Sequence, residues 1–185
     1  MRARTMTNMS ATLLTVVAIM SFAPTMAMAE SAPVFNKPMY AGSPHYYSDK
    51  WFASRLQVGY VKVWNDVDYL YISLYTTGDW YLKETHLAIA TDPCGFPMNK
   101  EGNPKVGHFP YQHENLDSKV DRYTIALSWA FDTKLYIAAH AVVEKRVDGC
   151  VVQVETAWVD CGGRDAHFPG NNWAFYFAYI VTAPA

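Results

Sequence analysis

The stretch from Gly59 to Tyr75, GYVKVWNDVDYLYISLY, decides the expected fold. Its first part alternates between apolar and polar residues, and Asn65 to Asp68 has the composition of a turn. Beyond the turn, Leu70, Ile72 and Leu74 share one face of an extended chain, and tyrosines occupy the other face. This period of two predicts a β-hairpin.

The same alternation continues on both sides of the hairpin. Turns are expected at 77–79 and 147–149, and residues 30–50 are expected to form an arm or a first edge strand. Further strands are predicted at 80–82, 85–90, 123–129, 135–143, 151–159 and 173–181. About eight strands and no helical periodicity predict an all-β, single-domain antiparallel β-sandwich or barrel-like fold. One long loop, from Asp92 to His113, carries four prolines and three glycines, and a connection of this length is more often functional than not.

The N-terminus has the features of a secretory signal. Arg2 and Arg4 precede an apolar run, Ala11 to Phe22, and Ala27-Met28-Ala29 supplies the small residues read by a signal peptidase. We expect cleavage between Ala29 and Glu30, which makes 1–29 a signal peptide and 30–185 one β domain exported to the periplasm, cell surface or medium. The apolar run is shorter than the roughly 20 residues of a membrane span.

The charge of the exported part excludes two classes of partner. Without Arg2 and Arg4 it has 13 basic and 17 acidic residues, a net charge of −4 with neutral histidines. No basic run interrupts this balance. We therefore expect neither nucleic acid nor an anionic membrane surface as a partner.

Three cysteines, Cys94, Cys150 and Cys161, would enter an oxidising compartment, where one disulfide and one free thiol are expected. Cys150 and Cys161 flank an extended segment whose ends would lie roughly 30 Å apart. A disulfide needs Cα atoms within about 7 Å. The favoured pair is therefore Cys94 with Cys161, and three reduced thiols are the alternative.

Five of the six histidines fall into two groups. His86 and His140 lie in expected strands, where a histidine is more often a hydrogen-bonded core residue than a ligand. His45, His108 and His113 lie in irregular segments, where binding residues concentrate. Neutral imidazoles from distant loops could together bind an ion such as copper. No HExxH or CxxC pattern is present, which disfavours a zinc hydrolase.

Two further chemistries are open. Glu84 and Glu155 could act as an acid–base pair on a sugar, although a strand glutamate more often accepts hydrogen bonds. The aromatic stripe in Trp173 to Val181, WAFYFAYIV, could be a carbohydrate platform, although core packing is the more common role. No motif for a nucleophile is present.

Five short motifs occur in a fixed order between residues 56 and 181: ETHL, FPYQHEN, IAAHA, ETAW and NWAFYFAY. This combination resembles a recurring all-β domain of exported bacterial proteins, mostly uncharacterised. More loosely, the chain is similar to the copper-repressible, surface-associated copper-binding proteins of methanotrophic bacteria. There, two histidines and a kynurenine hold one Cu(I), and the kynurenine derives from a tryptophan two residues before the first histidine.

The resemblance implies a copper site in this chain at His45 and His113. No Trp-x-His occurs, and Ser43 stands two residues before His45. We therefore expect an exported, non-enzymatic binding protein with a histidine-based copper site, acting in copper acquisition at the cell surface. A metal-free structural or interaction module, in which His113 and Glu114 lock the loop, is the alternative, and an enzyme acting on glycans is the third.

Overall fold

The computed structural model describes residues 34–42, 55–159 and 166–183. The expected signal peptide, its cleavage site and His45 lie outside these residues. No helix within the described ranges is long and apolar enough to cross a membrane.

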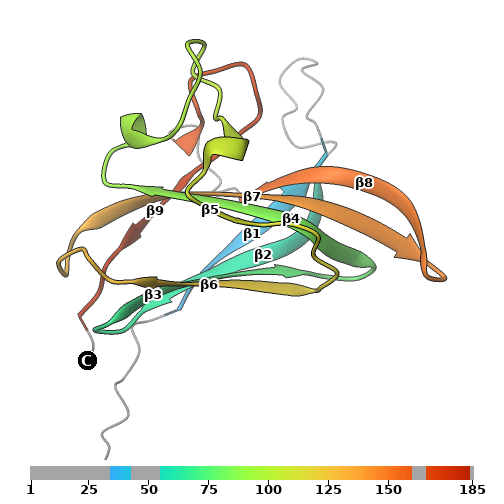
Figure 1. Ribbon diagram of the computed structural model, residues 1–185, viewed down its shortest axis with the longest axis horizontal. Helices are drawn as coiled ribbons and strands as arrows, with labels where there is room; N and C mark the ends of the chain where they lie inside the picture. The colour runs from blue at the N-terminus through green and yellow to red at the C-terminus, as the bar shows by residue number, and fades with distance from the viewer. Residues whose placement is uncertain (1–33, 43–54, 160–165, 184–185) are drawn as a thin grey trace, which may run out of the picture.

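The described residues form an all-β fold, as the alternation predicts (Figure 1). Every strand pair is antiparallel, in the order β5-β4-β7-β8-β1-β2-β3-β6, with β9 beside β7. The strands are β1 (Phe35–Ala41), β2 (Leu56–Asn65), β3 (Tyr69–Thr76), β4 (Trp80–Ala90), β5 (Tyr111–His113), β6 (Val120–Ala126), β7 (Lys134–Val147), β8 (Cys150–Val159) and β9 (Phe177–Ile180). Two 3₁₀ turns, η1 (Pro93–Gly95) and η2 (Val106–His108), lie between β4 and β5.

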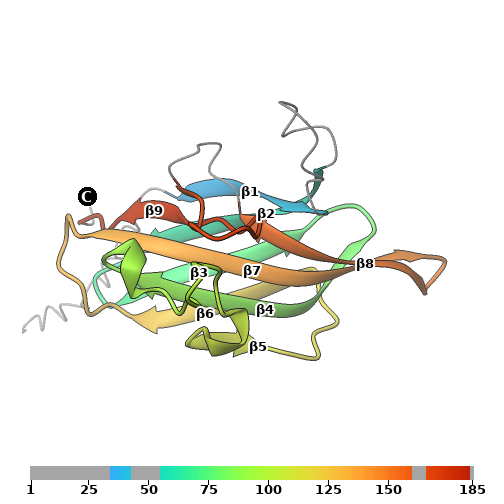
Figure 2. The ribbon, with the colours of Figure 1, turned by 90° about the horizontal axis from the view of Figure 1, so that it is seen from above.

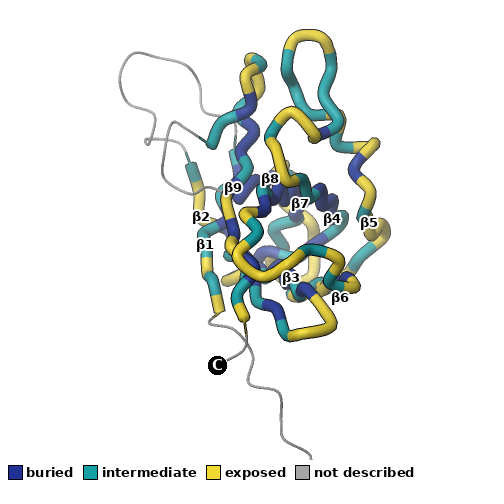
Figure 3. Tube along the Cα trace, turned by 90° about the vertical axis from the view of Figure 1, so that its left-hand side faces the viewer, coloured by how far each residue is buried: buried dark blue, intermediate teal, exposed yellow. Residues whose placement is uncertain are grey.

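The sheet folds over on itself so that β4, β7 and β8 lie above β2, β3 and β6 (Figures 1 and 2). Alternate side chains from both layers meet in the space between them, where the buried residues concentrate (Figure 3). This main core includes Val61, Leu70, Ile72, Leu74, Leu87, Leu135, Ile137, Val143 and Phe177. The hydrophobic face of each layer is therefore removed from water, which stabilises the fold.

The predicted hairpin is confirmed as β2 and β3. Asp66 stabilises its turn, because its carboxylate accepts hydrogen bonds from the backbone N–H groups of Asp68 and Tyr69 at 2.8 and 2.7 Å. The strands approach closely at Gly59, where a Cβ atom would lie 1.8 Å from the carbonyl oxygen of Tyr75. Only glycine permits this approach.

Three expectations about strands are wrong in detail. The first strand is no edge, because β1 pairs with both β2 and β8. The segments 80–82 and 85–90 form one strand, β4, with an irregularity between Leu82 and Glu84. The C-terminal strand covers only Phe177–Ile180, because the residues before it leave the sheet and pack into a second core.

This second core covers the outer face of β4, β7 and β8. The predicted long loop is present and packs against the sheet. Its Phe96 and Phe109 are buried in the second core, together with Phe168 from the segment before β9. Figure 1 shows both segments rising above the upper layer. Ala88, Ala138 and Trp158 form the sheet side of this core.

The described cysteines, Cys94 and Cys150, are exposed free thiols. The predicted Cys94–Cys161 disulfide is therefore not seen, and Cys161 lies outside the described residues.

Candidate functional site

Four side chains form one continuous row across the outer face of the upper layer. Gln112 of β5 lies opposite His86 of β4, His86 lies opposite His140 of β7, and His140 lies opposite Trp158 of β8. Residues directly opposite each other in an antiparallel sheet point to the same face. We call this set the histidine row.

The two histidines of the row face each other. Their Nδ1 atoms are 3.4 Å apart, and their ring centroids are 5.4 Å apart. On its other side His140 contacts Trp158, with ring centroids 4.8 Å apart. Both histidines are 6% exposed, so their positions are set by the surrounding packing.

Burial keeps both imidazoles neutral. It lowers the pKa of His140 to about 3, and the neighbouring His86 adds to this effect, because a nearby positive charge disfavours a second one. Burial also lowers the pKa of His86, but the carboxylates of Glu84 and Glu114 oppose this shift. Two unprotonated imidazoles therefore face each other next to two negative charges.

This arrangement fits an ion that accepts two nitrogen ligands. His86 and His140 would each supply one neutral imidazole nitrogen to such an ion. Within the described residues, no three His, Cys, Asp or Glu side chains group closely enough to hold a metal. Structural zinc almost always takes four ligands, so these two imidazoles alone do not make a structural zinc site.

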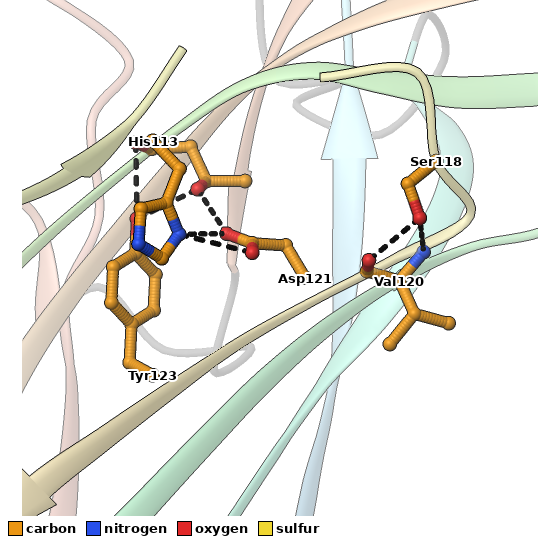
Figure 4. A network of polar contacts seen from close by, with 6 residues as sticks. His113, Ser118, Val120, Asp121 and Tyr123 are labelled. Carbon is orange, nitrogen blue, oxygen red and sulfur yellow. Dashed lines mark hydrogen bonds and ion pairs between the residues drawn. The ribbon is translucent and has the colours of Figure 1, made fainter. Parts of the chain in front are cut away.

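The second candidate, His113, is locked by neighbours at the end of β5 (Figure 4). Its Nδ1 lies 3.0 Å from both carboxylate oxygens of Asp121, and its ring stacks on Tyr123 with centroids 4.6 Å apart. Asp121 also accepts a hydrogen bond from the Thr85 hydroxyl, which lies 2.7 Å from the Tyr123 hydroxyl. Burial raises the pKa of Tyr123 to about 12, so its hydroxyl stays protonated.

This network joins the two ends of the sheet. β5 and β6 are the terminal strands of the pairing order and have no ladder between them. His113 comes from β5, whereas Asp121 and Tyr123 come from β6, so the side chains close the seam that the backbone leaves open. The sequence led us to expect His113 and Glu114 to bond backbone groups; instead, the His113 ring bonds the Asp121 carboxylate. Its Nδ1 is occupied by Asp121, which leaves Nε2 for any other partner.

The other residues singled out in the sequence do not form a site. Glu84 and Glu155 lie opposite Val142 and Val143, which are consecutive in β7, so the two carboxylates point to opposite faces of the sheet. They cannot act together on one glycosidic bond. His108 is exposed in η2. Three rings of the aromatic stripe, Phe175, Phe177 and Tyr179, are at most 4% exposed. They pack in the cores and do not form an exposed carbohydrate platform.

The sequence assigned His86 and His140 to the core, and they are buried, but it gave no sign that they are neighbours. Their separation of 54 residues matches no short motif. The signal that could have found them is the order of the strands, since ETHL and IAAHA lie on adjacent strands only after folding.

Comparison of the chain with family models, curated proteins and solved structures finds no match. The site is therefore interpreted from its own geometry.

Proposed function

We propose that the chain is an exported, non-enzymatic binding protein that holds one Cu(I) ion between His86 and His140. The observation that supports this proposal is the pair of Nδ1 atoms 3.4 Å apart on neighbouring strands. A metal ligand must be an unprotonated imidazole, and burial already keeps both rings in this state. Binding therefore needs little displacement of protons at physiological pH.

The surroundings favour a singly charged soft ion. Trp158 closes one side of His140, and apolar side chains of the second core lie beyond it. An apolar environment penalises a doubly charged ion more than a singly charged one. The carboxylates of Glu84 and Glu114 act electrostatically on His86 and would attract the cation towards the row.

The resemblance to the methanotroph copper-binding proteins supports a two-histidine site but places it differently. Glu84 stands two residues before His86, where those proteins have the tryptophan that becomes kynurenine. We therefore propose a site with two imidazoles and no oxidised tryptophan. Export is proposed from residues 1–29, whose pattern is that of a secretory signal.

A metal-free structural module is the second candidate. One observation favours it: a neutral His86 and a neutral His140 can share one N–H···N hydrogen bond at the same 3.4 Å separation. His86 and His140 would then form a buried, hydrogen-bonded pair next to the second core.

Copper titration separates the two candidates. The protein is titrated anaerobically with Cu(I) against a competing chelator, and the same is done for His86→Gln, His140→Gln and the control His108→Gln, which changes an exposed loop histidine. We expect one Cu(I) per wild-type and His108→Gln chain, and an affinity at least tenfold lower in the other two variants. X-ray absorption of the loaded protein should show two nitrogen ligands.

Variants of His45 and His113 test the site implied by the resemblance. If His45→Gln or His113→Gln abolishes binding while His86→Gln does not, the ion lies at the loop histidines. If the wild-type protein binds no Cu(I), or if His86→Gln lowers only the thermal midpoint, the metal-free module is the better account.

A further inference from the structure

The outer face of the lower layer carries aromatic and basic side chains in three ordered rows. We call it the aromatic face. The first row pairs Tyr60 of β2 with Tyr75 of β3, and the third pairs Trp64 of β2 with Tyr71 of β3. The middle row holds Lys62 of β2, Ser73 of β3 and Arg122 of β6.

The rings of the aromatic face form two stacked pairs. Tyr60 and Tyr75 have centroids 5.0 Å apart with 15° between their planes. Trp64 and Tyr71 have centroids 5.1 Å apart with 13° between their planes. All four rings remain partly exposed to solvent. Stacking fixes their orientation before any ligand arrives, which reduces the entropy lost on binding.

Two cations lie between these pairs. The ammonium group of Lys62 lies 5.5 Å from the Tyr60 ring and 5.2 Å from the Tyr75 ring. The guanidinium group of Arg122 lies 5.7 Å from the Trp64 ring, and its Nε donates to the Ser73 hydroxyl at 3.0 Å. Both side chains therefore lie over the face, and their remaining N–H groups can donate hydrogen bonds to a ligand.

The charge of this face is opposite to that of the chain. The chain has a net charge of −2, whereas the three rows carry two cations and no carboxylate. No ion pair within the described ranges involves Lys62 or Arg122. Asp66, in the turn at one end of the face, is engaged by the Tyr71 hydroxyl at 2.8 Å. The rows therefore complement an anion.

We propose that the aromatic face binds an acidic saccharide, a glycan that carries carboxylate groups. Arg122 and Lys62 pair with the carboxylate, because a guanidinium donates two parallel hydrogen bonds to this group. The rings on either side contact the apolar C–H faces of neighbouring sugars. Two residues along a strand span about 6.7 Å, so the three rows cover about 13 Å, enough for more than one sugar ring.

A single-stranded nucleic acid also combines anions with flat rings, but the rest of the chain disfavours it. Proteins that bind such strands use a continuous basic groove along the backbone. Here only two cations lie on the three rows, which do not form a continuous basic track along a phosphate backbone. This proposal is independent of the copper site, because the histidine row lies on the outer face of the other layer.

The test measures binding of polygalacturonate, a carboxylated polysaccharide, by calorimetry at low salt. Its fully methyl-esterified form has the same sugar backbone without the charge, and a thymidine oligonucleotide supplies the nucleic acid comparison. The variants are Arg122→Gln and Lys62→Gln. Lys134→Gln is the matched control, because Lys134 lies 5.0 Å from the Tyr136 ring on the other layer.

We expect the wild-type protein and Lys134→Gln to bind polygalacturonate equally and the esterified polymer at least tenfold more weakly. Arg122→Gln should lose about tenfold in affinity, since one charge-assisted hydrogen bond accounts for a change of that size. The proposal is overturned if polygalacturonate does not bind, if Lys134→Gln weakens binding as much as Arg122→Gln, or if the oligonucleotide binds as tightly. Arg122 is exposed, so its replacement leaves the core intact.

Discussion

Acid should destabilise this protein through the buried imidazole of His140. Its pKa is about 3 in the folded state, because burial and the neighbouring His86 disfavour its charged form, and about 6.5 in an unfolded chain. Between these two pKa values, the unfolded chain binds a proton at His140 that the folded protein does not bind. The contribution of His140 to stability is fully present above about pH 7 and is lost as the pH falls from 6.5 towards 3.

The size of the effect follows from the two pKa values. At pH 5 the pH lies about 1.5 units below the pKa of the unfolded imidazole and still above that of the folded one. Protonation of the unfolded chain therefore lowers the unfolding free energy by roughly 2 kcal/mol relative to pH 7. His140 is 6% exposed, so solvent screens this effect little. For a domain of this size, 2 kcal/mol is a large part of a typical unfolding free energy.

The assay is urea unfolding of the copper-free protein at pH 7 and pH 5. Other groups also titrate in this range, so the informative quantity is the difference between the wild type and His140→Gln, whose amide carries no charge at either pH. The wild type should lose about 2 kcal/mol more than the variant. Equal losses would refute the reasoning, as would an NMR titration in which the His140 ring protonates between pH 7 and pH 5.

Three further outcomes follow from the same contacts. If the histidine row binds Cu(I), its affinity should fall less between pH 7.5 and pH 6 than that of two ordinary imidazoles, which would lose roughly tenfold over this range. The chelator competition measures this difference. His113→Ala should lower the unfolding free energy by about 1 kcal/mol, because Asp121 loses a partner at the β5–β6 seam, and should leave the Cu(I) affinity unchanged. Gly59→Ala should destabilise by about 3 kcal/mol in the same urea assay, because its Cβ would collide with the Tyr75 carbonyl group; an unchanged midpoint would show that β2 and β3 can separate there.

Local sequence patterns predicted most of the architecture. The alternation in β2 and β3 and the turns that follow it identify strands because a pleated chain places successive side chains on opposite faces. The hairpin, the all-β class and the long loop were predicted from these signals. The position of β1 inside the sheet was not, because strand order depends on contacts between distant segments, and no local pattern encodes them.

The candidate sites were also predicted only in part from the sequence. The sequence by itself determined that histidines in β4 and β7 would be buried and that the tyrosines of β3 would share a face. Only the tertiary structure decided that His86 lies opposite His140, that His113 meets Asp121, and that Arg122 joins the aromatic face. The physical reason is that composition and period set the face to which each side chain points, whereas the pairing register of strands far apart in the chain sets its neighbours.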